Sequence, residues 1–120
     1  MEIRTRDRVP AFVTADGSTI RELVGLRATP GAAAHSLAEA SLARGQATER
    51  HYHARTEETY YLVEGRGLME VDGETAEVAA GDAILIPPGS RHQIRNTGEG
   101  PLRLLCACAP PYRDEDTFFN

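Results

Sequence analysis

The feature that most constrains the fold is a series of short β-type runs, each ended by turn residues. Residues 59–65 and 67–71 are rich in apolar and β-branched side chains, and Asp72-Gly73 separates the second run from a similar one at residues 74–78. Asp-Gly between two such runs is a strong signal for a hairpin turn. Three more runs follow, at residues 83–86, 92–96 and 102–109. About eight short strands at this spacing are typical of an all-β sandwich or barrel.

The first half of the chain is less regular. Residues 19–26 fit a strand or a helix, but their short length and the turn expected at residues 29–31 favour a strand. Residues 35–43 contain good helix formers, yet strands follow them, so we expect context to override propensity and to give another strand. Residues 1–18 show no clear periodicity and are expected to form an arm with one edge strand.

Composition places the chain among single-domain globular proteins. Its 120 residues are 41% hydrophobic and 26% charged, which is enough for one core. The formal net charge of -5 argues against a surface for nucleic acid or anionic membrane, so a small organic molecule is the expected partner. No apolar run approaches the ~18 residues of a membrane span, and the N-terminus lacks the apolar region of a signal peptide. We therefore expect a cytoplasmic protein.

The cysteines and the basic residues exclude two kinds of chemistry. Cys106 and Cys108 are two apart in an expected strand, so their side chains point the same way about 6.6 Å apart. That separation is too long for a relaxed disulfide, and we expect two reduced thiols in the cavity wall. All 13 basic side chains are arginine, so a lysine Schiff base is excluded.

Three of the four histidines fall in two short segments bounded by glycine. In a strand, His51 and His53 share one face because side chains alternate, so both rings can reach one point. Glu57 and Glu58 follow after a short link that can turn the chain back beside this strand, and spacing alone does not choose between them. His92 opens a later strand after a Pro-Pro-Gly turn. Imidazoles with a carboxylate suit one divalent transition metal such as iron, manganese, zinc, nickel, cobalt or copper, whereas calcium prefers six or more oxygen ligands.

At these positions the sequence resembles the cupins. Their first motif is G-x5-H-x-H-x4-E-x6-G, and its fixed places are filled by Gly45, His51, His53, Glu58 and Gly65. Their second motif is G-x5-P-x-G-x2-H-x3-N, and its fixed places are filled by Gly81, Pro87, Gly89, His92 and Asn96. Ten matched positions at fixed spacing are far more specific than a lone pair of histidines.

The resemblance implies a double-stranded β-helix, or jelly-roll barrel, with one divalent transition metal per chain. The implied metal ligands are His51, His53, Glu58 and His92. The resemblance also selects Glu58 over Glu57, because only Glu58 occupies the motif position, and Glu57 should then point to the outer face.

The expected organisation is an N-terminal arm at residues 1–18, the cupin barrel at 19–112 and an acidic tail at 113–120. Several strands are apolar on both faces, so one face fills the barrel and the other needs a cover. Related small cupins commonly pair through such a sheet, and often exchange N-terminal strands. We therefore expect a homodimer in which the arm is exchanged.

Other candidate residues are placed by strand parity. Tyr60 should point into the barrel beside the site, where its hydroxyl is a candidate for a catalytic proton relay, although a core tyrosine is the alternative. Tyr61 should face the opposite layer. His35 matches no motif position and is expected at the surface, and Arg91 and Arg95 are expected to face solvent or an interface.

Two classes of function fit these observations. The first is a metal-dependent enzyme acting on a small oxygenated molecule, by dioxygenase-like oxidation of an enediol or polyphenol, or by Lewis-acid isomerisation, cyclisation or elimination. In the dioxygenase version Glu58 completes a ligand set that resembles that of quercetinases. The second class is a non-catalytic module that binds a small molecule.

Overall fold

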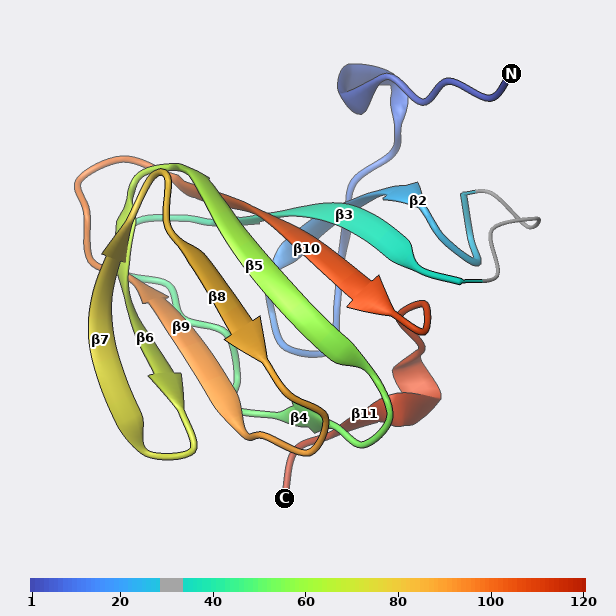
Figure 1. Cartoon of the computed structure of the whole chain (residues 1–120). Helices are drawn as coiled ribbons and strands as arrows, with labels where there is room; N and C mark the ends of the chain where they lie inside the picture. The colour runs from blue at the N-terminus through green and yellow to red at the C-terminus, as the bar shows by residue number, and fades with distance from the viewer. Residues whose placement is uncertain (29–33) are drawn as a thin grey trace.

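The computed structural model describes residues 1–28 and 34–120, and it confirms an all-β chain (Figure 1). The strands are β1 (Phe12–Val13), β2 (Thr19–Val24), β3 (Ser36–Leu42), β4 (Tyr52–His53), β5 (Glu57–Glu64), β6 (Arg66–Val71), β7 (Glu74–Ala79), β8 (Ala83–Ile86), β9 (His92–Asn96), β10 (Leu102–Ala109) and β11 (Thr117–Phe118). A short 3-10 helix, η1 (Arg6–Arg8), precedes β1, and a second, η2 (Asp114–Asp116), lies between β10 and β11. The eight runs predicted as strands between residues 19 and 109 each contain a strand, and the arm contributes β1. The turn expected at residues 29–31 lies outside the described residues.

The strands form an antiparallel jelly-roll barrel. The larger sheet has the order β1-β2-β3-β10-β5-β8, the smaller sheet has the order β7-β6-β9, and β11 pairs with β4. Strands such as β3 and β10 are therefore far apart in the chain but adjacent in the sheet. The expected fold class is confirmed.

Strand β3 shows why local propensity was a poor guide. Its two edges pair with β2 and β10, so its backbone is satisfied on both sides by the sheet. Ser36, Ala40 and Leu42 are buried on one face. This fully paired position stabilises the extended conformation more than the helix propensity of alanine and glutamate opposes it.

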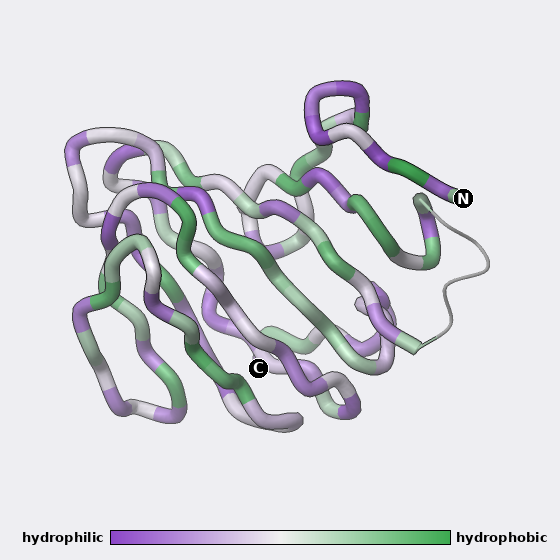
Figure 2. The backbone as a smooth tube through the Cα atoms, turned by 45° about the horizontal axis from the view of Figure 1, so that its top comes forward, coloured by the Kyte–Doolittle hydropathy of each residue, from purple (hydrophilic) through white to green (hydrophobic). Residues whose placement is uncertain are grey.

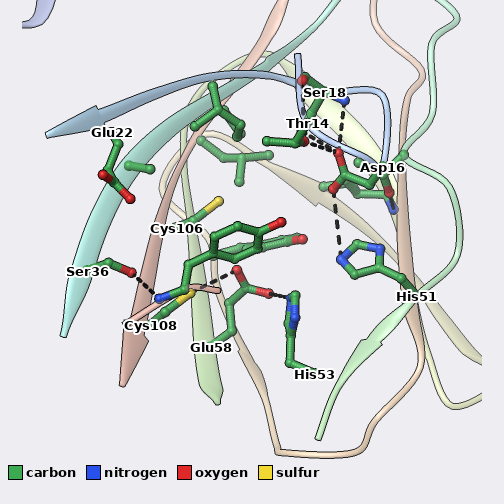
Figure 3. A pocket seen from close by; sticks show the side chains of 18 of the residues that line it. Thr14, Asp16, Ser18, Glu22, Ser36, His51, His53, Glu58, Cys106 and Cys108 are labelled. Carbon is green, nitrogen blue, oxygen red and sulfur yellow. Dashed lines mark hydrogen bonds and ion pairs between the residues drawn. The ribbon is translucent and has the colours of Figure 1, made fainter. Parts of the chain in front are cut away.

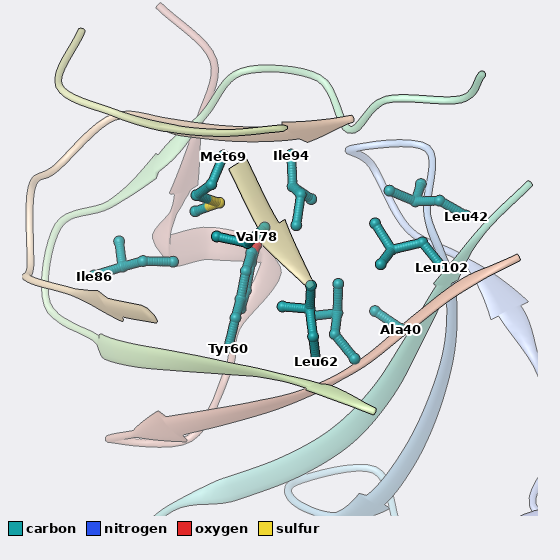
Figure 4. Packing of buried hydrophobic residues seen from close by; sticks show 10 residues of the cluster. Ala40, Leu42, Tyr60, Leu62, Met69, Val78, Ile86, Ile94 and Leu102 are labelled. Atoms are coloured by element: carbon teal, nitrogen blue, oxygen red, sulfur yellow. The ribbon is translucent and has the colours of Figure 1, made fainter. Parts of the chain in front are cut away.

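One hydrophobic core lies between the two sheets. Figure 4 shows side chains of the larger sheet, among them Leu62 and Ile86, packed toward Met69, Val78 and Ile94 of the smaller one. In Figure 2 the hydrophobic segments follow the strands, and hydrophilic segments gather in turns and near the N-terminus. Because this core is built from apolar side chains, we expect the barrel to fold without an ion at the site.

The N-terminal arm lies against its own barrel. Strand β1 pairs with β2 at the edge of the larger sheet. Arg6 of η1 reaches Glu39 on β3, with 3.0 Å between Nε and Oε1, and the Arg21 guanidinium donates to the carbonyl of Val9 at 2.5 Å. Glu39 is buried beneath these contacts.

The acidic tail is also fixed to the barrel. Its strand β11 pairs with β4, so that Thr117 lies opposite His53. The carboxylate of Asp116 accepts hydrogen bonds from the backbone N–H groups of residues 54–56, at 3.1 to 3.2 Å. In the described part of the chain, no helix is long and apolar enough to cross a membrane.

Candidate metal centre

Two segments far apart in the chain meet at a backbone bridge. His51 N donates to His92 O at 3.1 Å, and His92 N donates to His51 O at 2.8 Å. His53 follows two residues later, at the end of β4. The three rings are buried, with centroids 4.3 to 5.6 Å apart, and one ligating atom from each lies within 4.8 Å of the others. These three histidines form a group that could hold a metal ion.

A backbone carbonyl orients each of the three rings. Nδ1 of His51 lies 2.7 Å from the carbonyl oxygen of Glu49, and Nδ1 of His92 lies 2.9 Å from the carbonyl oxygen of Ser90. In His53 the partner is the carbonyl of Asp116, at 3.2 Å. A carbonyl only accepts, so each Nδ1 carries the proton and each Nε2 keeps a free lone pair. This is the arrangement by which metal-binding histidines are normally held.

Glu58 enters the same space from β5. Its Oε1 lies 3.3 Å from His92 Nε2 and 3.5 Å from His53 Nε2, and its Oε2 accepts a hydrogen bond from the Cys108 thiol at 3.2 Å. Among the described residues, Glu58 Oε1 and His92 Nε2 are buried atoms without a hydrogen-bond partner. Buried polar atoms are rarely left unpaired, and a carboxylate oxygen beside imidazole nitrogens is a donor set that a divalent cation would satisfy.

The charges of the site are set by its own residues. Burial opposes ionisation of Glu58, but the neighbouring imidazoles of His53 and His92 lower its pKa well below the ordinary value. Burial, followed by the neighbouring His92, lowers the pKa of His51. Burial and the Glu58 carboxylate raise the pKa of Cys108, so Cys108 is a neutral hydrogen-bond donor to Glu58. The site therefore offers one carboxylate and no thiolate.

The parity expectations hold around the site. Tyr60 is buried, and its ring centroid lies 5.9 Å from that of His92, whereas Tyr61 is 45% exposed on the other face of β5. Glu57 is exposed, as expected for the outer face. Both cysteines line the same pocket as Tyr60 and are free. Burial and the nearby Glu58 raise the pKa of Tyr60, so its hydroxyl keeps its proton.

Three other candidates lie outside the site. His35 is exposed. The Arg91 guanidinium stacks over the ring of Tyr52, with 4.6 Å from Cζ to the centroid, and Arg95 donates to the carbonyl of Gly45 at 3.2 Å. These arginines hold neighbouring segments of the barrel in place, which agrees with their expected positions.

A pocket of about 700 Å³, including its opening to solvent, leads to the histidines. Figure 3 shows Glu58 and His53 at one side of it and Asp16 with His51 at another. The inner faces of β2, β3 and β10 supply an apolar wall, which contains Ile20, Ala38, Ala40, Leu42 and Leu104. The pocket thus joins an apolar chamber to a polar, ligand-rich end.

Sequence reasoning missed two aspartates and one aromatic residue. Asp16, in the turn between β1 and β2, has its Oδ2 3.8 Å from His51 Nε2. The carbonyl of Asp116 in the tail orients His53, and the Phe119 ring lies 5.9 Å from the His51 ring. Only Asp16 carried a usable signal, because Thr14-x-Asp-x-Ser18 is typical of a turn closed by side-chain hydrogen bonds. Contacts between the tail and residue 53 leave no local pattern.

Comparisons with known proteins agree with this geometry. A family model described as the cupin domain matches residues 38–108. An uncharacterised protein of Methanocaldococcus jannaschii is 48% identical over 111 residues, which cover 92% of this chain and 88% of that protein. Polyketide synthase CurC of Streptomyces cyaneus is 35% identical over 82 residues, which cover 68% of this chain but only 53% of that protein. The solved structure of the polyketide cyclase RemF from Streptomyces resistomycificus superimposes with a TM-score of 0.78 and 27% identity, over 97% of this chain and 89% of that chain.

The histidine cluster predicts one divalent ion per chain. His92→Ala and His51→Ala should each abolish stoichiometric metal, as measured by elemental analysis, while circular dichroism keeps the β spectrum because the core is separate from the site. His35→Ala is the matched control, since His35 is exposed, and it should bind metal as the wild type does. Stoichiometric metal in the double His51→Ala, His92→Ala variant would show that the site is assigned to the wrong residues.

The tail contacts predict that Asp116 supports metal binding from outside the ligand set. Asp116→Ala removes the acceptor for the N–H groups of residues 54–56 and loosens the segment that orients His53, so metal affinity should fall about 10-fold in a competition titration. Asp114→Ala is the control, because its carboxylate contacts Arg27 and Tyr112 and not residues 54–56. Equal affinities of the two variants would rule out this role.

Proposed function

The chain belongs to the cupin family, and from this we propose that it is a metal-dependent enzyme that acts on a small hydroxylated organic molecule. The single observation that carries the proposal is a group of three buried histidines, each oriented by a carbonyl at Nδ1, whose ligating atoms lie within 4.8 Å of one another. The buried Glu58 carboxylate lies beside two of them. In this proposal one divalent transition metal per chain is held by His51, His53, Glu58 and His92.

The donor set supports a Lewis-acid role. A divalent ion bound by neutral imidazoles and one carboxylate keeps a net positive charge and would polarise a carbonyl or hydroxyl oxygen of the substrate. The hydrogen bond from Cys108 fixes Glu58 Oε2, so that Oε1 is the oxygen free to act as a ligand. Neutral imidazole is the ligand form, so lowering the pH weakens the site.

The lining of the pocket suits a substrate that is mostly apolar and carries oxygen atoms at one end. Ile20, Leu42 and Leu104 form part of a wall that would contact hydrocarbon or aromatic rings, and the polar groups gather near the histidines. Pockets of this kind bury most of a small ligand and use a few polar groups to fix its orientation. A polyphenol or a related polyketide fits this division.

We favour cyclisation, isomerisation or elimination without oxidation. The support comes from the relatives, because one is named a polyketide synthase protein and another is a polyketide cyclase at 27% identity. Tyr60 is the proposed proton relay, since its buried hydroxyl keeps its proton and its ring lies beside His92. The apolar wall would exclude water from the reacting group.

Dioxygenase-like oxidation of an enediol or polyphenol is the second candidate. Glu58 favours it, because an anionic ligand completes a three-histidine, one-carboxylate set at this position. In that case a redox-active metal is required and oxygen is consumed.

The two reactions are separated by one experiment. Metal-free protein is loaded with Zn(II), Fe(II), Mn(II), Ni(II) or Co(II) and incubated with a panel of polyphenols and polyketide-like enols, with an oxygen electrode and mass spectrometry as readouts. We expect turnover with Zn(II), no oxygen uptake, and a product that is isomeric with the substrate or has lost water. Oxygen uptake with only the redox-active metals would establish the second candidate, and binding without conversion would establish a non-catalytic binding module.

The role of Tyr60 gives a further prediction. Tyr60→Phe removes the hydroxyl but keeps the ring in the core, so turnover should fall about 100-fold while metal content is unchanged. Tyr61→Phe changes the adjacent, outward-facing tyrosine and should leave turnover unchanged. If both variants keep full activity, Tyr60 is a core residue and has no part in the reaction.

We also propose a homodimer formed through the outer face of the larger sheet. Leu85 is 59% exposed there and Tyr61 is 45% exposed, in neighbouring strands of the same face. Light scattering should give twice the 13.1 kDa of one chain, and Leu85→Arg should give the single-chain mass. A wild-type particle of single-chain mass would contradict the dimer, and exchange of the arm would require a release of the Arg6–Glu39 contact.

The proposed location is the cytoplasm. Cys106 and Cys108 are free thiols on one face of β10, which suits a reducing compartment. The net charge of -5 fits a partner that is a small molecule and not a nucleic acid.

A further inference from the structure

Asp16 is the second carboxylate that reaches the histidine cluster, and no cupin motif contains it. It lies in the turn between β1 and β2, and one of its oxygens is fully engaged within that turn. Oδ1 accepts hydrogen bonds from Thr14 Oγ1 at 2.7 Å, Ser18 N at 2.9 Å and Ser18 Oγ at 2.6 Å. Three short contacts to one oxygen fix the plane of the carboxylate.

The same turn is tied to the segment that carries His51. Glu49 N donates to the carbonyl of Asp16 at 2.8 Å, and the carbonyl of Glu49 in turn orients His51 through Nδ1. The Gln46 side chain donates to the carbonyl of Gly17 at 2.8 Å. Asp16 and His51 therefore keep a fixed relation that does not depend on any bound molecule.

The other oxygen, Oδ2, points into the pocket. It lies 3.8 Å from His51 Nε2, and no hydrogen bond to another described residue holds it (Figure 3). Two donors at right angles on one ion, with bonds of about 2.1 Å, lie about 3 Å apart. Glu58 Oε1, at 3.3 and 3.5 Å from two histidines, is nearer to that distance than Asp16 Oδ2 is. The geometry suits a group that contacts a molecule beside the ion and not the ion itself.

The charge of the pocket favours one type of molecule. Among the described lining residues the carboxylates are Asp16, Glu22 and Glu58, and the guanidinium is that of Arg27. Arg27 is engaged by Asp114 at 2.9 Å and by the face of Phe12, with 4.4 Å from Cζ to the ring centroid. Apart from the proposed metal ion, a carboxylate substrate would therefore meet only negative side chains and no free guanidinium, whereas a hydroxyl group would meet an acceptor.

We propose that Asp16 is a specificity-determining residue of this site, whose Oδ2 accepts a hydrogen bond from a hydroxyl group of a neutral substrate bound beside His51. Its negative charge also disfavours dicarboxylates. The proposal rests on the proposed function, because it names the substrate class of the same site: vicinal diols and polyphenols over dicarboxylic acids.

The test measures binding, so it does not depend on knowing the reaction. Zn(II)-loaded protein is titrated by calorimetry with catechol, a neutral vicinal diol, and with oxalate, a dicarboxylate without a hydroxyl hydrogen. Asp16→Asn should weaken catechol about 10-fold, because a hydrogen bond to a charged acceptor is lost, and should tighten oxalate at least about 3-fold. Zinc should stay at one ion per chain, since Asp16 is not a ligand.

Two further variants separate the effect of the orientation of the Asp16 carboxylate from the effect of its charge. Glu22→Gln removes a carboxylate from the same pocket, but Glu22 Oε2 is already bonded to the N–H groups of Arg27 and Ala28, so both affinities should stay within about 2-fold. Ser18→Ala keeps the charge of Asp16 and removes a bond that orients it, so it should weaken catechol and leave oxalate unchanged. Ser18→Ala also tests the proposal if Asp16→Asn fails to fold.

The outcomes that overturn the proposal are distinct. Unchanged catechol and oxalate affinities in Asp16→Asn, or equal shifts in Glu22→Gln, show that Asp16 does not select the ligand. Loss of zinc in Asp16→Asn shows that it is a metal ligand. Zinc uptake by the wild type without catechol binding refutes the substrate class alone, whereas a wild type that takes up no zinc refutes the proposed function and this inference with it.

Discussion

The backbone bridge between His51 and His92 is the constraint on which the site depends. It joins two segments that lie 41 positions apart in the chain, and it fixes the distance between two imidazoles by main-chain hydrogen bonds of 3.1 and 2.8 Å. The carbonyls at Nδ1 then set the orientation of each ring. Ligand placement thus depends on main-chain atoms, which set both the separation of the two segments and the orientation of each ring.

The two ends of the chain complete this arrangement. The tail orients His53 through the carbonyl of Asp116, and the arm places Asp16 beside His51. Both contacts are made by segments outside the matched cupin domain of residues 38–108. The barrel therefore supplies the ligands, and the terminal segments supply the orientation of one ligand and the second acidic group of the pocket.

The fold and the histidine cluster could be predicted because both depend on patterns between residues that are close in the sequence. Alternation placed His51 and His53 on one face and separated Tyr60 from Tyr61, whereas the cupin motif selected Glu58 over Glu57. Propensity failed at β3, where pairing on both edges outweighs the helix preference of its residues. Asp116 had no local signal, because its role arises only from a contact across 63 positions of the chain. The reaction depends on pocket side chains from several strands. Spacing within one strand does not show how side chains from different strands lie relative to one another, so the reaction could not be predicted.

The central claim is that His51, His53 and His92 bind one metal through Nε2 while Nδ1 stays protonated. Nitrogen-15 NMR of the histidine rings, recorded on metal-free protein and after one equivalent of Zn(II), measures this for each ring separately. The account predicts that these three rings keep Nδ1–H in both spectra and shift at Nε2 on zinc addition, whereas His35 does not respond. A zinc-induced shift at Nδ1, or no shift in any of the three rings, would contradict it.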